Sequence, residues 1–258
     1  MLNFPNPQEV PLIKVPLSEV ICQVKFSPIL NIAKELPTDF QEAVRIRFPG
    51  FEVEQGVMFR IPASGAIEKP VVDTTPRAYQ FNSADKSANL TLSTDFFAVS
   101  TKSYSHWQDF LSDFSLAEAP LFRIYHPAYA TRIGLRFVNH FTRKNTGLKS
   151  THEILDIFRN ELTCVLHTDA WEEPKEMLSQ MLLNDGGANM AMRIGYGKNQ
   201  NEPYFLLDFD YFEEGQLPFQ GKGFLSEKLN YYHSRIYSAF RWCLKETSLE
   251  LFLHQKGE

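Results

Sequence analysis

The sequence predicts an α+β fold built from two similar halves, each with helices and antiparallel strands. Each half begins with a predicted strand of similar residue pattern. The two strands are "PLSEVICQVKFSP" (Pro16–Pro28) and "TRIGLRFVNHF" (Thr131–Phe141). Each strand leads into a helix, then into several short strands, and then into a long amphipathic helix. We therefore place a first α+β repeat with an N-terminal arm at 1–130 and a second at 131–258.

The strand of the first half shows period-two alternation, which is typical of a half-buried strand. One of its faces is apolar and consists of Val20, Cys22, Val24 and Phe26. A helix is expected to follow, because Thr38 and Gln41 have the spacing of a capping box. Pro49 and Gly50 should stop this helix.

Short strand candidates come next in the first half. They cover 51–55, 57–61, 77–83 and 89–101. The stretch 62–76 holds three prolines and is expected to be a long exposed loop. A helix over 105–125 closes the half, since Ser105 and Gln108 form a second capping-box pattern and aromatic residues recur on one helical face.

The second half repeats this order. Its opening strand has Ile133, Leu135 and Phe137 on one face, with Arg132 and Arg136 on the other. The other predicted elements are a helix over 150–162 with Ser150 and Glu153 as capping box, strands over 176–184, 189–197 and 203–212, and a long helix over 224–244. The loops "DGGA" and "KNQNE" join the three strands and suit hairpins.

The two halves also match at a few individual positions. When "LTLSTDFF" (Leu90–Phe97) is aligned with "FLLDFDYF" (Phe205–Phe212), a leucine, an aspartate and a phenylalanine coincide. A strand that precedes its helix in this way resembles a helix-grip unit. At the level of pattern, the duplicated plan resembles the saddle of the TATA-binding protein.

Composition favours a globular, cytoplasmic protein. The chain has 258 residues, is 43% hydrophobic, and carries a formal net charge of −5. This charge argues against a general nucleic-acid binder, which needs a basic face for phosphate contacts. The N-terminus lacks the order of a signal peptide, and the sequence holds no apolar run long enough to cross a bilayer. The cysteines (Cys22, Cys164 and Cys243) are widely spaced, so we expect buried free thiols.

Charge is unevenly distributed along the second half. Residues 132–149 include five basic side chains and no acid, and residues 202–214 include five acids and no base. One interpretation is that the two runs lie on neighbouring strands and pair. The other is a basic groove for an anionic ligand, and its candidate binding residues are Arg132, Arg136, His140, Arg143 and Lys144.

Catalytic signatures are absent from the sequence. It contains no nucleophile elbow, phosphate loop, HExxH motif or paired-carboxylate motif, so we predict no catalytic residue, no cofactor and no metal. Asp208 and Asp210 are two residues apart on one strand and could together hold a divalent metal. Because alternation makes Leu207, Phe209 and Tyr211 the buried set, the aspartates should instead face solvent or the basic strand.

Three stretches together resemble a known group of proteins. They are "PLSEVICQVKFSP", the mid-chain "RIGLRFVNHF" and the C-terminal helix "LNYYHSRIYSAFRWCLKETSLELF". The chain is similar over nearly its whole length to a sporadically distributed prokaryotic family of about 260 residues, close to the 258 of this chain. That family has no established activity, and its patchy distribution implies accessory roles such as defence or toxin neutralisation.

These observations lead to a main hypothesis and two alternatives. The main one is a non-enzymatic binding or regulatory protein whose partner is another protein or a second copy of itself. The first alternative is binding of a nucleic acid or nucleotide through the basic stretch 132–149. The second is a metal-dependent hydrolase that uses Asp208 and Asp210.

Overall fold

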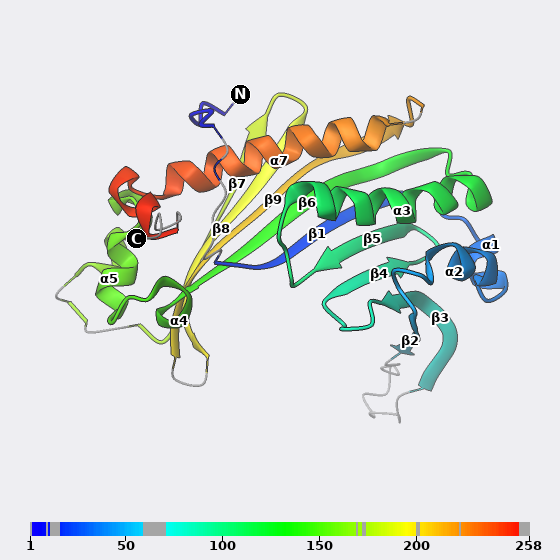
Figure 1. Cartoon of the computed structure of the whole chain (residues 1–258), viewed down its shortest axis with the longest axis horizontal. Helices are drawn as coiled ribbons and strands as arrows, with labels where there is room; N and C mark the ends of the chain where they lie inside the picture. Colours follow the sequence, from blue (N-terminus) through cyan, green and yellow to red (C-terminus); the bar gives the residue numbers. More distant parts are fainter. Residues whose placement is uncertain are drawn as a thin grey trace, which may run out of the picture. The chain divides into compact units, whose positions relative to one another are not determined.

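Helices and strands are both abundant in the computed structural model (Figure 1), which describes residues 2–8, 10, 16–58, 71–168, 170–171, 174–199, 202–221 and 223–252. Its strands pair into a large antiparallel sheet, so the predicted α+β class is confirmed. The strands are β1 (Leu17–Phe26), β2 (Gly50–Met58), β3 (Val71–Asn82), β4 (Ala88–Leu92), β5 (Phe96–Thr101), β6 (Tyr129–Thr142), β7 (Met177–Asp185), β8 (Ala188–Asn199) and β9 (Glu202–Pro218). The α-helices are α1 (Asn31–Lys34), α2 (Thr38–Val44), α3 (Trp107–Tyr125), α4 (Arg143–Thr146), α5 (Thr151–Asp156), α6 (Asn160–Thr163) and α7 (Phe224–Cys243). Two 3₁₀ helices are also present in the described residues, η1 (Cys164–Leu166) and η2 (Glu246–Phe252).

The strand order among the described residues is β2-β3-β4-β5-β1-β6-β9-β8-β7. The chain divides into two compact units. Unit 1 comprises Met1–Val20, Gly134–Glu213 and Lys222–Glu258, and unit 2 comprises Ile21–Ile133 and Glu214–Gly221. Strands β1, β6 and β9 contribute residues to both units.

Unit 2 is built around the helix α3 and its strands. The ring of Phe114 on α3 lies 5.3 Å from that of Phe97 on β5, and the ring of Phe40 on α2 lies 5.6 Å from that of Phe81 on β3. These four rings are buried. Burial of such rings removes roughly 150–250 Å² each from water, so they contribute a large apolar area to this core.

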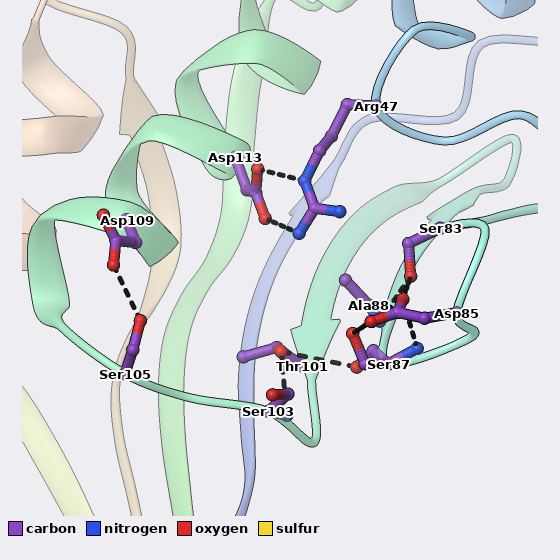
Figure 2. A network of polar contacts seen from close by, with 10 residues as sticks. All are labelled: Arg47, Ser83, Asp85, Ser87, Ala88, Thr101, Ser103, Ser105, Asp109 and Asp113. Atoms are coloured by element: carbon purple, nitrogen blue, oxygen red, sulfur yellow. Dashed lines mark hydrogen bonds and ion pairs between the residues drawn. The ribbon is translucent and has the colours of Figure 1, made fainter.

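Polar contacts at the surface of unit 2 hold its helices and hairpins in place (Figure 2). Arg47 follows α2, and its Nε and Nη2 atoms donate to the carboxylate of Asp113 on α3 at 2.7 Å each. In the loop between β3 and β4, Asp85 accepts hydrogen bonds from the hydroxyls of Ser83 and Ser87 and from the Ser87 N–H. The bond from Ser83, with those from Ser87, lowers the pKa of Asp85 to about 2.

Unit 1 is covered on one sheet face by α7, the long helix near the C-terminus (Figure 1). The ring of Tyr211 on β9 lies 4.9 Å from that of Tyr232, and the ring of Phe141 on β6 lies 6.3 Å from that of Phe240. Odd-numbered residues of β6 and β9 therefore face α7. Even-numbered residues of these strands lie on the opposite face of the sheet, which we call the open face of unit 1.

Most strands and both long helices lie where the sequence predicts them. The exceptions among the strands are local. Strand 89–101 is two strands, β4 and β5, because the chain turns at 93–95 with a Ser93 N–H to Phe96 carbonyl bond of 2.8 Å. The candidates 51–55 and 57–61 belong to one strand, β2, as far as Met58. Of the loop predicted over 62–76, residues 71–76 form part of β3, and the rest lies outside the described residues.

The sequence predicts one continuous helix over 150–162, and this prediction is wrong because the structure has two short helices there, α5 and α6. The chain leaves helical geometry between α5 and α6, where Phe158 forms a β-bridge with Leu244. The N–H of Arg159 donates to the carbonyl of Cys243 at 3.0 Å, and the N–H of Lys245 donates to the carbonyl of Ile157 at 2.9 Å. These bonds to the last residue of α7 and to the segment after it replace the bonds that a continuous helix would make.

The predicted capping boxes have mixed outcomes. Ser150 is the N-cap of α5, and its hydroxyl accepts from the N–H of Glu153 at 3.2 Å. The predicted caps at Thr38 and Ser105 are wrong, since α2 and α3 begin after Pro37 and His106 with no side-chain cap. The Ser105 hydroxyl instead donates to the carboxylate of Asp109 at 2.7 Å (Figure 2).

The cysteines are free, as predicted, but differ in burial. Cys22 and Cys243 are buried, and burial raises the pKa of both thiols. Cys164 is exposed, which contradicts the expectation that all these thiols are buried. Among the helices of the described residues, none combines the length and the apolar character needed to cross a membrane.

His233 of α7 is a buried titratable group in the core of unit 1. Its ring lies 5.7 Å from that of Phe137, and burial lowers its pKa to about 4 from an ordinary 6.5. Between pH 4 and pH 6.5 the His233 imidazole is protonated in the unfolded chain and neutral in the folded chain. The contribution of the neutral imidazole to the free energy of unfolding is therefore complete above pH 6.5 and is lost as the pH falls towards 4. We expect His233→Gln to remove about 3 kcal/mol of the acid-induced fall in the free energy of unfolding.

Urea denaturation between pH 4 and pH 7 measures this effect. His106→Gln is the matched control, because His106 is exposed at the start of α3. The control should keep the pH dependence of the parent chain. Equal pH dependence in the parent chain and in His233→Gln would contradict the assignment.

Candidate functional site

The predicted binding residues lie on β6 and on the short helix that follows it. Arg132, Arg136 and His140 are on β6, and Arg143 and Lys144 begin α4. Arg132 belongs to unit 2 and the other four to unit 1.

A reciprocal capping box positions α4. The Thr142 hydroxyl accepts from the N–H of Asn145, and the Asn145 side chain accepts from the N–H of Thr142. Gly147 ends the helix with φ at +74°, a conformation that glycine adopts without strain. The chain therefore turns sharply directly after the basic residues of β6.

The centre of the open face of unit 1 is a polar row that runs across four strands. Arg136 on β6 donates from Nε and Nη2 to the two carboxylate oxygens of Asp208 on β9, at 2.7 Å each. Arg193 on β8 donates from Nη1 to Asp208 at 3.1 Å and from Nε to Gln180 on β7 at 2.8 Å. The bidentate bond that Arg136 donates to Asp208 is the main cause that raises the pKa of Arg136.

Asp208 is the buried member of this row. Its side chain is 2% exposed, whereas those of Arg136 and Arg193 are 40% and 26% exposed. The two guanidinium groups thus cover the carboxylate and compensate its charge. This arrangement agrees with the expectation that the aspartate faces the basic strand, and it excludes the alternative that Asp208 faces solvent.

The other arginines of the basic stretch also lie beside carboxylates. Arg143 donates from Nε and Nη2 to Glu202 at 3.1 and 2.7 Å. In unit 2, Arg132 Nε lies 3.7 Å from a carboxylate oxygen of Glu214. The prediction that the basic and acidic runs pair is confirmed for these residues.

His140 and Lys144 differ from the arginines. The Nδ1 atom of His140 lies 3.0 Å from the Ser18 hydroxyl, and its ring packs edge-on against Tyr204 at 5.1 Å. Burial lowers the pKa of His140, and the charge of Asp208 opposes that effect. His140 therefore favours the neutral form beside the polar row, and Lys144 is exposed.

The geometry around the aspartates bears on metal binding. Both carboxylate oxygens of Asp208 are occupied by guanidinium donors. The described part of the chain holds no group of three or more His, Cys, Asp or Glu side chains that could hold a metal ion. A metal bound at Asp208 would first have to displace Arg136 and Arg193.

Sequence reasoning missed Arg193 and Gln180. The signal for both lay in the hairpin register, since a two-residue loop after Asp185 places Gln180 opposite Arg193. The next hairpin places Arg193 opposite Asp208. Counting residues outward from the two hairpin loops would have predicted that Gln180, Arg193 and Asp208 lie side by side on one face of the sheet.

A second buried carboxylate of unit 1 was also missed. Asp185, at the end of β7, accepts from the N–H of Leu2 at 2.8 Å, from the Tyr211 hydroxyl at 2.9 Å and from Arg235 Nε at 2.8 Å. Arg235 Nη2 also donates to the Leu2 carbonyl at 2.9 Å. These bonds attach the N-terminal arm to β7, β9 and α7.

In comparisons with known proteins, no protein-family model and no curated protein sequence matches the chain. The similarity to a sporadically distributed prokaryotic family therefore stays a prediction. The class that the structure itself defines is an α+β protein with a large antiparallel sheet.

Proposed function

We propose that this chain is a non-enzymatic binding or regulatory protein that binds another protein along the terminal strand β7 of unit 1. The observation that carries the proposal is the composition of that strand. Leu178 and Leu182 are 67% and 65% exposed, and Met177–Asn184 contains no charged residue. No described strand pairs with the outer edge of β7. Exposed apolar side chains on such a strand favour a partner that adds a strand of its own.

The charge distribution favours a protein partner over a nucleic acid. A phosphate group on the basic stretch would have to displace the carboxylate that lies beside Arg132, Arg136 or Arg143. The net charge of −5 adds a general repulsion towards polyanions. Binding of a nucleic acid or nucleotide through 132–149 is therefore the weaker proposal.

The metal-dependent hydrolase is weaker for a similar reason. It would need Asp208 as a metal ligand, and that carboxylate is buried beneath two guanidinium groups. Release of the arginines would leave their charges uncompensated over the sheet.

We also propose that the two halves of the chain arose by internal duplication. The order β1, α1, α2, β2 to β5 and α3 resembles the order β6, α4 to α6, β7 to β9 and α7. Two copies of one unit, with the boundary predicted near 130, would account for this order. The saddle-like arrangement rests on the same resemblance of plan, and an accessory role such as defence rests on the similarity to the sporadically distributed prokaryotic family.

Recovery of bound proteins from cells that make the chain tests the proposal. We expect Leu178→Lys/Leu182→Lys to reduce recovery of a bound protein about tenfold or more, because two charges oppose strand addition. The matched control is Leu30→Lys/Ile46→Lys, which adds the same charge at side chains of unit 2 that are 78% and 94% exposed. Equal recovery with both double variants would contradict the proposal.

A further inference from the structure

Strand β7 stands at one end of the strand order of the sheet. In the described part of the chain it pairs with β8 along one edge, and no described strand pairs with its other edge. Leu178 and Leu182 share the open face, and Met181, which is 36% exposed, lies on the face of α7.

The hairpin register identifies the backbone groups on the outer edge. Asp185 and Ala188 face each other across the two-residue loop of Gly186 and Gly187, and such a pair is hydrogen-bonded. Hydrogen-bonded and non-hydrogen-bonded pairs alternate along an antiparallel ladder. The N–H and C=O groups that point away from β8 therefore belong to Leu178, Gln180, Leu182 and Asn184.

The two terminal strands of the order differ in charge. Strand β2 carries the exposed acids Glu52 and Glu54, and such charges discourage edge-to-edge pairing. Strand β7 has no charged residue before Asp185, whose carboxylate is bonded to Arg235. Two β7 strands can consequently approach each other with no opposed like charges.

We propose that the partner at β7 is a second copy of this chain, paired antiparallel about a two-fold axis at Gln180. This inference rests on the proposed function, because it names the protein that binds the strand. In this register Gln180 faces Gln180 of the other copy, and Leu178 of each copy faces Leu182 of the other. An antiparallel pair of identical strands is self-complementary, so the contact closes as a dimer.

The apolar side chains select this register. Moving it by two residues in one direction would place Leu178 opposite Asn184 and Leu182 opposite Gln180. Moving it by two in the other direction would place Leu178 opposite Gln180. The register centred on Gln180 opposes leucine to leucine twice, and such cross-strand pairs stabilise a sheet.

Disulfide trapping tests the register. In a Cys164→Ser background, which removes the exposed native thiol, we expect Gln180→Cys to form a covalent dimer under mild oxidation. Residues opposed in this way have Cα atoms about 5.5 Å apart, within the range of a disulfide. Asn184→Cys is the matched control on the same strand and face, and it should stay monomeric because its two copies lie far from the axis.

Sedimentation of the full chain tests the dimer itself. We expect the mass to rise from 29.8 kDa towards twice that value with concentration, and Leu178→Lys/Leu182→Lys to stay monomeric. Leu30→Lys/Ile46→Lys should still dimerise. Cross-linking at residue 184 and not at 180 would overturn the register.

A parent chain that is monomeric at all concentrations and does not cross-link at 180 would overturn the inference. If Leu178→Lys/Leu182→Lys nevertheless loses a captured protein, the proposed function stands and only the self-pairing is refuted. If that variant changes neither self-association nor capture, both are refuted.

Discussion

Asp208→Ala is expected to lower the free energy of unfolding by about 3 kcal/mol. The carboxylate is buried and accepts three hydrogen bonds from Arg136 and Arg193. Its removal leaves two positively charged groups close together on the sheet, with no acceptor for the donors that faced it. Urea denaturation at neutral pH measures the loss.

Removal of one arginine should cost much less. In Arg136→Met the carboxylate of Asp208 keeps its bond to Arg193, so we expect a loss of about 1 kcal/mol. Glu202→Gln is the control for a surface pair, because Arg143 and Glu202 are 44% and 40% exposed, and it should cost much less than Asp208→Ala. Similar losses of unfolding free energy in Asp208→Ala and Glu202→Gln would show that the buried carboxylate stabilises the fold no more than a surface carboxylate does.

A double variant separates the pair from its surroundings. If Arg136 and Asp208 act on each other, the cost of Asp208→Ala should be smaller in the Arg136→Met background, with a coupling of about 1 kcal/mol or more. Strict additivity of the two substitutions would contradict the direct bond as a source of stability.

The strands of unit 1 are predictable because their signals are local. A two-glycine loop between two strand-like stretches defines the hairpin of β7 and β8, and the apolar periodicity of 224–244 defines α7. The break between α5 and α6 was not predictable in this way. It depends on the bridge between Phe158 and Leu244, which are far apart in the sequence.

The polar row was predictable only in part, for the same reason. Alternation placed Asp208 on the face opposite the buried aromatic residues, and one of the two interpretations of the charge runs was that its strand pairs with the basic strand that carries Arg136. Burial of Asp208 depends on Arg193 as well, which approaches from the other neighbouring strand. Side-chain alternation defines a face of a strand, whereas the depth of a residue depends on which strands lie beside it.

Asp185→Ala should have an effect of similar size, about 3 kcal/mol, and should also release the N-terminal arm. Asp185 is buried and accepts from Leu2, Tyr211 and Arg235, so its loss leaves three donors without their acceptor. Urea denaturation measures the first effect. Trimming of the N-terminus by an aminopeptidase, followed by intact mass, measures the second, and we expect it to accelerate. Unchanged trimming would show that the arm is held by other contacts.

The pH dependence of Asp185→Asn tests the charge of this group. Burial alone would raise the pKa of Asp185, but the bonds from Leu2 and Tyr211 and the charge of Arg235 outweigh burial and lower it below 3.8. A carboxyl with a lowered pKa stabilises the fold above its unfolded value, and this contribution is lost as the pH falls below it. The stability difference between the parent chain and Asp185→Asn should therefore be full at pH 7 and shrink below about pH 4. Asp156→Asn, at the exposed end of α5, is the surface control and should change stability by less than about 0.5 kcal/mol at pH 7. If the stability difference between the parent chain and Asp185→Asn does not change with pH, the charge of Asp185 does not contribute to stability and only the shape of its side chain does.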